Sequence, residues 1–182
     1  MNIADELRPE SIIDLCCGTG HQLKLLKKQG FDNLTCVDFS EEMLRTAAQG
    51  VNAPDCLYAD AADTGLLSDS ADLVIISLAL HEKPAEKGAA VLKEAHRILK
   101  PGAVLLIADY TADGSVPLVA SAVIRFIEFL AGSEHYANYR NYISRGGLES
   151  LIDATAFTSA ARYPVAMGGI TVEELIKQDG HK

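Results

Sequence analysis

The stretch S-I-I-D-L-C-C-G-T-G, Ser11 to Gly20, decides the fold of this chain. It is an apolar run with one acid, Asp14, and it breaks into a loop of small residues that ends Gly18-Thr19-Gly20. The sequence H-Q-L-K-L-L-K-K follows at once and has helical spacing. The stretch therefore predicts a strand, a tight turn and a helix, so that a ligand can approach the backbone beside the partly positive start of the helix.

The same alternation continues toward the C-terminus. The sequence predicts strands at about 11–17, 33–38, 56–59, 71–78 and 104–109, and helices at about 19–29, 40–48 and 85–99. Strands that alternate with helices predict right-handed crossovers and an open α/β sheet covered on both faces. The continuous apolar run at 71–78 is typical of a central strand buried on both sides.

The alternation breaks after residue 110. We expect a helical insert at 111–145, with helices at about 117–131 and 133–143, and a further helix at 148–155. Strands are expected at 157–164 and 170–176, joined by a short link that contains glycine, so one of them would run antiparallel to the rest. A chain of 182 residues predicts a single domain, 1–182, that includes the insert.

The composition of the chain argues against several classes of binding partner. The net charge of −9 predicts a surface that repels phosphate backbones, so nucleic acid is not expected. No window approaches the ~18 apolar residues of a membrane span, and no signal peptide is seen. The four cysteines lack the C-x-x-C spacing of metal sites, so we expect no metal, reduced thiols and a cytoplasmic location.

Acids follow several of the predicted strands. Asp38, Asp60 and Asp109 each close a strand, and His81 follows another. Because ligands of open α/β sheets bind at the carboxyl ends of the strands, these side chains are expected to share one site. Asp38 can accept two hydrogen bonds from a ribose, Phe39 offers a face to a purine, and Asp60 can accept from an exocyclic amine. Each acid could instead cap a helix or solvate a turn.

Two classes of adenosine cofactor fit this corner. A dinucleotide site favours G-x-G-x-x-G, but Leu23 stands where the third glycine would be. Asp14, a carboxylate beside the loop, suits a ligand with an ammonium group better than a pyrophosphate. A nicotinamide-dependent oxidoreductase is therefore the weaker alternative.

The ordered motifs resemble those of the class I S-adenosylmethionine-dependent methyltransferases over nearly the whole chain. They are I-I-D-L-C-C-G-T-G (12–20), V-D-F-S (37–40), A-D-A (59–61), D-L-V-I-I-S-L-A-L-H-E (72–82) and H-R-I-L-K-P-G-A (96–103). Within that superfamily the chain is most similar to the branch around the ubiquinone/menaquinone C-methyltransferases. The resemblance implies a Rossmann-like, doubly wound sheet of seven strands in the order 3-2-1-4-5-7-6, with strand 7 antiparallel and the helical insert between strands 5 and 6.

The resemblance also implies the cofactor site. S-adenosylmethionine would be held by Asp14, Cys16, Cys17, Gly18, Thr19, Gly20, Asp38, Phe39, Ser40, Met43, Asp60, Ala61, Ser77 and Leu78. Asp14 and the loop would hold the methionine moiety, Asp38 the ribose, and Phe39 and Met43 the adenine. Cys16 departs from the family pattern because it replaces the first glycine of G-x-G-x-G.

Methyl transfer from a sulfonium is an in-line displacement, for which the protein mainly aligns the reacting groups. Such positioning contributes roughly 7–11 kcal/mol. If the acceptor must lose a proton, His81 is the best candidate base, followed by His135. Tyr110 would line the mouth of the site, so the predicted catalytic residues are His81, Tyr110 and His135. Each histidine could instead pack or cap without a catalytic role.

The insert is expected to select the acceptor. Five of the eleven aromatic residues lie in it, which favours an aromatic or apolar small molecule. Candidate acceptor-binding residues are Glu82, Arg125, Glu128, Tyr136, Tyr139 and Arg140. The alternatives are a solvated stripe on a packed helix and a homodimer contact through the insert. A binding or assembly protein that has lost turnover is the non-enzymatic alternative.

Overall fold

The segment around Ser11–Gly20 forms the predicted strand, turn and helix. The computed structural model describes residues 7–153 and 156–178. In it, β1 (Ile12–Leu15) is followed by the glycine loop and by α2 (His21–Lys28). The strand ends two residues before the predicted boundary because Cys16 has a φ of 62°, which turns the chain out of the sheet.

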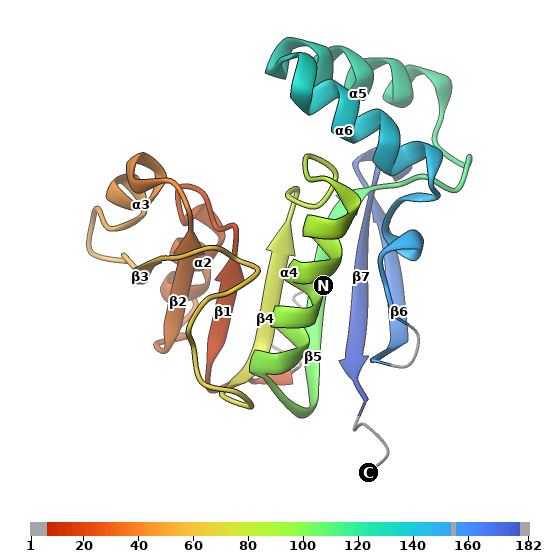
Figure 1. Ribbon diagram of the computed structural model, residues 1–182. Coiled ribbons are helices and arrows are strands. Elements are labelled where there is room, and N and C mark those ends of the chain that lie inside the picture. Colours follow the sequence, from red (N-terminus) through yellow and green to blue (C-terminus); the bar gives the residue numbers. More distant parts are fainter. Residues whose placement is uncertain (1–6, 154–155, 179–182) are drawn as a thin grey trace.

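Seven strands form one sheet in the order β3-β2-β1-β4-β5-β7-β6, which confirms the predicted topology (Figure 1). The parallel strands are β1, β2 (Leu34–Asp38), β3 (Asp55–Tyr58), β4 (Ala71–Ser77) and β5 (Leu99–Tyr110). The last two, β6 (Phe157–Val165) and β7 (Ile170–Lys177), form the predicted hairpin, and β7 runs antiparallel to β5. The short helix η2 (Ala166–Gly168) closes this hairpin.

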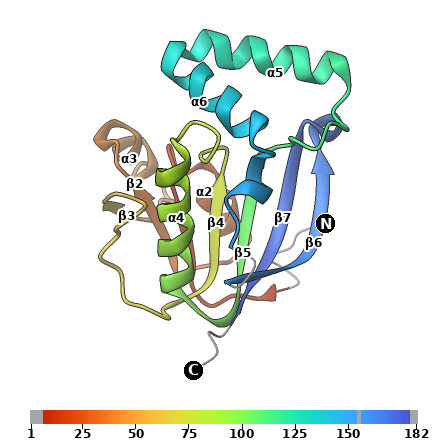
Figure 2. The same cartoon turned by 45° about the vertical axis from the view of Figure 1, so that its right-hand side comes forward.

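Helices cover both faces of the sheet, as Figure 2 shows for α4 (Ala85–Ile98) and α2. Alternate strand residues enter two separate cores, because side chains alternate across a strand. Ile13 and Leu15 pack with Val91 of α4, whereas Ile12 packs with Leu23 of α2. The helix α3 (Glu41–Ala47) joins α2 on its face, and the Ser40 hydroxyl caps it by accepting from the Met43 amide at 3.3 Å.

Two predicted boundaries are wrong. Strand β5 begins at Leu99 rather than Val104, because Leu99 already pairs with Ala71 before an irregularity in the ladder. The helix expected at 148–155 is a single short turn, η1 (Gly147–Ser150); residues 154–155 lie outside the described part. The stripe that suggested a longer helix still packs on the core, through Leu148 and Leu151.

The insert consists of α5 (Leu118–Ala131) and α6 (Ser133–Ser144), close to the predicted bounds. Gly132, with a φ of 123°, separates the two helices. Both views place the pair above the end of the sheet where β4 and β5 finish (Figures 1 and 2). Across the described residues, no helix combines the length and apolar character that a membrane span requires.

The expectation of reduced cysteines is wrong for two of the four. Cys17 and Cys36 form a disulfide, with 5.5 Å between their Cα atoms. The 19-residue separation gave no sign of this pair. Because β1 and β2 are neighbours, Cys17, the second residue after β1, meets Cys36 in the middle of β2. Cys16 and Cys56 are free.

Candidate functional site

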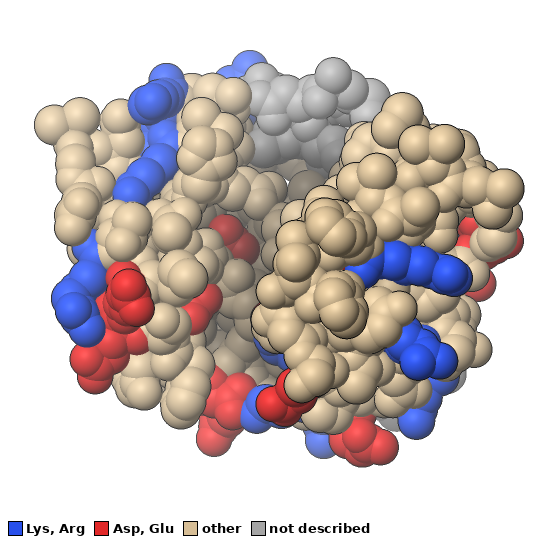
Figure 3. Space-filling view, turned by 90° about the horizontal axis from the view of Figure 1, so that it is seen from above, with Lys and Arg blue, Asp and Glu red and all other residues tan. Residues whose placement is uncertain are grey.

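The carboxyl ends of β1 to β4 surround a pocket of about 650 Å³, within the range typical of small-molecule sites. Seen from above, the molecule is hollowed between two lobes, with acidic side chains in the hollow (Figure 3). Ten predicted site residues line the pocket: Cys16, Gly18, Asp38, Phe39, Ser40, Met43, Asp60, Ala61, Leu78 and Glu82. Ala79, Lys83 and Lys87 also line it and were not predicted.

Asp38 shapes the floor of the pocket. Its Oδ2 accepts a hydrogen bond from the Gly18 amide at 2.8 Å, and its Oδ1 accepts one from the Ser40 amide at 2.9 Å. The carboxylate therefore fixes the glycine loop to the start of α3. Each oxygen keeps acceptor capacity, which a ribose hydroxyl can use.

The far end of the pocket offers an aromatic platform and a second carboxylate. Phe39 is 69% exposed and stacks on Tyr58 with 5.3 Å between ring centroids. Asp60 accepts from the Ala62 amide at 2.9 Å and forms an ion pair with Lys87. The hydrogen bond from Lys87 lowers the pKa of Asp60, so its carboxylate stays charged.

Asp14 lies beneath the loop and is 2% exposed. Its Oδ1 has no hydrogen-bond partner among the described residues. Burial, with the charge of Asp38, raises the pKa of Asp14 to about 8. A buried carboxylate without a partner is costly, and an ammonium group bound beside it would satisfy it. This orphaned atom fits the amino group of an amino-acid nucleoside.

Cys16 stands between charges of both signs. Burial raises the pKa of its thiol to about 11; Lys83 opposes this rise, and Asp38, Glu82 and Asp14 add to it. Lys83 hydrogen-bonds to Glu82 at 3.2 Å and to Cys16. Burial alone would lower the pKa of Lys83, but these partners outweigh it and raise the pKa, so the ammonium stays charged.

Four predicted cofactor residues support the pocket from outside its lining. Cys17 is held in the disulfide, and Gly20, with a φ of 66°, begins α2. A Cβ on Gly20 would lie 2.9 Å from the Cβ of Ala47, so glycine permits this packing of α2 against α3. Thr19 is exposed, and the Ser77 hydroxyl donates to Gln22 at 2.8 Å.

A second cluster lies under α5, where β4 and β5 end. His81 Nδ1 and Asp109 Oδ1 are 2.6 Å apart, and Asp109 also accepts from the backbone amides of Leu80 and Tyr110. Burial opposes the charge on His81, but the hydrogen bond to Asp109 and the nearby carboxylates outweigh it and raise the pKa of His81. The ring is therefore held in one orientation and favours its protonated form.

Glu128 of α5 completes this cluster. Its Oε1 accepts from the Tyr110 hydroxyl at 2.8 Å and lies 3.6 Å from His81 Nε2. Its Oε2 is buried and has no partner among the residues described. Burial, then the bond to Glu128, raises the pKa of Tyr110, so its phenol stays neutral. His81 and Tyr110, predicted as catalytic, are thus brought together with Glu128, predicted to bind the acceptor.

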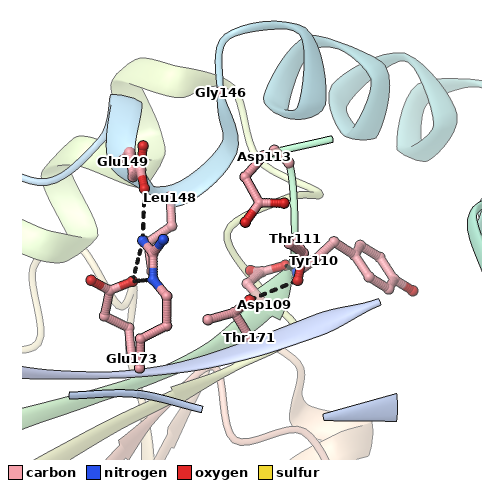
Figure 4. Close-up of a pocket in the computed structure, with 11 residues that line it drawn as sticks. Asp109, Tyr110, Thr111, Asp113, Gly146, Leu148, Glu149, Thr171 and Glu173 are labelled. Atoms are coloured by element: carbon pink, nitrogen blue, oxygen red, sulfur yellow. Dashed lines mark hydrogen bonds and ion pairs between the residues drawn. The ribbon is translucent and has the colours of Figure 1, made fainter. Parts of the chain in front are cut away.

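A small cavity lies beyond Asp109, between β5, β7 and η1 (Figure 4). Arg162 crosses it to Glu173 and Glu149, each at 2.8 Å, and the hydroxyls of Thr111 and Thr171 are 2.7 Å apart. The cavity measures about 30 Å³, which is the room of one water molecule. It therefore supports the end of β5 and is too small for a substrate.

Comparison with known proteins identifies the family. Residues 13–107, just over half of the chain, match the methyltransferase domain family. The chain belongs to this methyltransferase family. The expected class, an S-adenosylmethionine-dependent methyltransferase of class I, is thereby confirmed, and the protein is an enzyme with S-adenosylmethionine as its cofactor.

Individual relatives agree with this family. A demethylmenaquinone methyltransferase of Clavibacter sepedonicus is 28% identical over 94% of this chain and 75% of its own length. One of Listeria monocytogenes is 28% identical over 72% of this chain and 59% of its own length. A solved methyltransferase structure from Methanosarcina mazei superposes with a TM-score of 0.69 at 15% identity, covering 98% of both chains.

The remaining predicted residues of this methyltransferase lie on α6 and α5. His135 Nε2 is 3.6 Å from Glu82 Oε2, at the rim of the cofactor pocket. Arg125, Tyr136, Tyr139 and Arg140 line a separate groove of about 590 Å³ between the two helices. Within the part of the chain that the structure describes, this groove and the cofactor pocket share no lining residue. Contact of these four residues with the acceptor stays a prediction.

Sequence reasoning placed Asp109 at the expected site but did not predict that it pairs with His81, and it gave no role to Lys83 or Tyr58 in this methyltransferase. The pairing could have been found, because Asp109 lies near the end of the strand beside the one that His81 follows. Lys83 gave no signal, since only the turn after His81 brings it to Cys16. Tyr58 needed the pairing of β2 with β3, which places Asp38 opposite Tyr58.

Proposed function

We propose that the enzyme transfers the methyl group of S-adenosylmethionine to a small aromatic or apolar acceptor by in-line displacement. The observation that carries the proposal is the buried Asp14, whose Oδ1 has no partner among the described residues, beside a pocket whose far end is lined by Phe39 stacked on Tyr58. An ammonium at one end and a purine at the other are the two ends of this cofactor. The names of the two relatives support a small-molecule acceptor.

Each end of the cofactor has its own residues in this proposal. Asp14 binds the amino group, and Lys83 binds the carboxylate. Asp38 accepts from the ribose hydroxyls, Phe39 and Met43 pack on the adenine, and Asp60 with Ala61 meets its edge. When bound, the cofactor supplies an activated methyl group, so the chain has to orient the acceptor and exclude water.

His81 is the proposed general base for an acceptor that must lose a proton. Asp109 fixes its ring, and Nε2 faces the side of the cluster that α5 covers. Glu128 Oε2 has no partner there and is proposed to accept a hydrogen bond from the acceptor as it enters. Tyr110 stays neutral and orients Glu128.

Two measurements test the proposed function. Isothermal titration calorimetry should detect binding of adenosylhomocysteine and no binding of NAD. Adenosylhomocysteine should then form from S-adenosylmethionine with demethylmenaquinone as the first acceptor tried. Binding of NAD alone would overturn the proposal, and binding of adenosylhomocysteine without turnover on any acceptor of a phenol and quinol panel would limit the chain to cofactor binding.

The pH dependence of turnover tests the base. His81 must be neutral to accept a proton, so activity should rise with pH through a limb above 6.5, the ordinary pKa of histidine. Asp109→Asn removes the main cause that raises the pKa and should move this limb to lower pH while reducing kcat. A limb that stays in place in Asp109→Asn would rule out His81 as the titrating base.

The proposal also covers the partners and the cellular location of the enzyme. We propose no nucleic-acid partner, because the chain carries a net charge of −9. We also propose a cytoplasmic location. The Cys17–Cys36 disulfide argues against this location, because disulfides are rare in the cytosol. Thiol counting on protein isolated under acid quench tests the location: a bridge that is oxidised in the cell would contradict it.

A further inference from the structure

The groove between α5 and α6 has walls that differ from the rest of the molecule. It is lined by Arg125, Tyr136, Ala137, Tyr139, Arg140, Asn141, Ile143 and Ser144. Among the described residues, two guanidinium groups and no carboxylate line it, although the chain has 25 acidic against 16 basic residues. Figure 3 shows basic side chains on the lobe to the right of the hollow, with acidic ones toward its edges.

Neither guanidinium has an acidic partner. Arg45, Arg97 and Arg162 each pair with a carboxylate, whereas Arg125 and Arg140 have none within residues 7–153 and 156–178. Arg125 instead hydrogen-bonds to the Tyr139 side chain, and the Arg140 guanidinium lies 5.9 Å from the centre of the Tyr136 ring. The other donors of Arg125 and those of Arg140 therefore remain available to an anion, which guanidinium can bind in a bidentate manner.

Aromatic rings form the floor between the two arginines. Tyr136 and Tyr139 are stacked, with 6.3 Å between centroids and 25° between planes, and Phe129 meets Tyr136 edge-on at 6.0 Å. Tyr139 is 5% exposed, so its ring is fixed by packing. A flat ring can lie on such a surface while its charged group reaches the arginines.

We propose that this groove is a second small-molecule site, separate from the cofactor pocket, for an aromatic ligand that carries a carboxylate or a phosphate. The volume of about 590 Å³ accommodates one such molecule. The residues of α6 that approach the cofactor pocket are others, His135 and Asn138, which contact Glu82. Tyr139 connects the groove to the catalytic cluster, because its ring meets Tyr110 at 5.5 Å.

Titration of ¹⁵N-labelled protein with benzoate and with phenyl phosphate tests the site by NMR. Both probes should shift the amide resonances of residues 136–144, and the tighter one identifies the preferred anion. Benzyl alcohol, which has the ring without the charge, and acetate, which has the charge without the ring, should each bind at least ten-fold more weakly. Equal binding of benzyl alcohol and benzoate would overturn the proposal.

Variants make the test specific to the two arginines. The double variant R125Q/R140Q should raise the Kd of benzoate and of phenyl phosphate at least ten-fold. Arg45→Gln on α3 removes the same charge elsewhere and should leave both Kd values unchanged. An unchanged Kd in the double variant overturns the site.

Adenosylhomocysteine provides the independent control. It should bind the double variant and the unaltered protein equally, which also shows that the variant is folded. If it binds neither protein while benzoate binding depends on the arginines, the proposed methyl transfer is contradicted and the proposed groove site is supported. If it binds both proteins while the Kd of benzoate is the same in both, the proposed groove site is contradicted and the proposed function is supported.

Discussion

Asp14 destabilises the empty protein, and we propose that its carboxylate binds the amino group of the cofactor. Its folded pKa is raised from 3.8 to about 8, so the folded state binds a proton that the unfolded state has lost. Stability of the empty protein therefore falls as pH rises through this range.

Asp14→Asn should stabilise the empty protein at pH 8 by about 1–3 kcal/mol, because it removes an unsatisfied buried charge. The advantage should shrink toward pH 4, where both side chains are neutral. Thermal unfolding across this pH range measures the effect. The same variant should lose most of the stabilisation that adenosylhomocysteine gives the unaltered protein; full retention would show that Asp14 does not bind the cofactor.

Lys83, in the turn before α4, has a matched control in Lys87 on the first turn of that helix. Lys83→Met should weaken adenosylhomocysteine about ten-fold, because it removes one charge-assisted hydrogen bond, and should leave 5′-methylthioadenosine, which lacks the amino-acid part, unchanged. Lys87→Met should weaken both ligands alike, since its partner Asp60 lies at the adenine end. Calorimetric titration of both ligands decides this, and equal losses in Lys83→Met would contradict the assignment.

The order of residues along the chain revealed the cofactor side of the site more fully than the catalytic side. Asp38 ends β2, Phe39 follows it, and Asp60 comes shortly after β3, so the strand pattern places them at one edge. Glu128 meets Tyr110 across 18 residues and His81 across 47, and its spacing in α5 suggested only a shared helix face. That contact depends on the angle at which α5 crosses the sheet, which spacing does not encode.

At the scale of elements, two charged side chains of α4 tie the loop after β3 to that helix. Glu94 is buried and accepts from the Thr64 amide at 2.8 Å, and its partner Arg97 donates to the Leu66 carbonyl at 2.7 Å. The bond from Arg97 lowers the pKa of Glu94 from 4.5 to about 2. Since this loop also carries Ala61 of the pocket wall, these bonds hold part of the cofactor site.

Glu94→Gln should destabilise the protein by about 2 kcal/mol at pH 7. The folded pKa is depressed, so the contribution is complete above pH 4.5 and is lost as pH falls toward 2. Urea unfolding of both proteins at several pH values measures this, and the two should converge at the acid end. A constant difference across the series would mean that the charge of Glu94 is not responsible.

Most helices and strands were predicted to within a few residues of their bounds, but apolar periodicity alone did not guarantee a helix. The sheet order is confirmed, as are α5 and α6. The helix expected at 148–155 is a single turn, because its apolar stripe reflects burial of Leu148 and Leu151 rather than a helical backbone. The disulfide depends on which strands are neighbours, so the spacing of the cysteines could not reveal it.

At the scale of the whole molecule, α5 leaves an apolar surface uncovered. Leu118 is 89% exposed, Phe126 62% and Leu130 67%. A surface of this kind marks an interaction site in soluble proteins, and a second copy of the chain is the partner that we expect.

Sedimentation velocity should therefore show a dimer that Phe126→Glu converts to a monomer. Leu67→Glu changes an equally apolar side chain, 79% exposed in the loop before β4, and should leave the dimer intact. A monomer at every concentration in the unaltered protein would contradict this expectation.

The Cys17–Cys36 bridge joins two walls of the cofactor pocket, since Cys17 adjoins Gly18 and Cys36 precedes Asp38 by two residues. Closing the bridge and loading the cofactor are therefore two sides of one thermodynamic cycle. Any factor by which the bridge tightens adenosylhomocysteine binding must equal the factor by which adenosylhomocysteine disfavours reduction of the bridge by dithiothreitol at equilibrium. If that factor exceeds one, the balance of thiols and disulfides around the protein also sets the fraction of enzyme that carries its methyl donor.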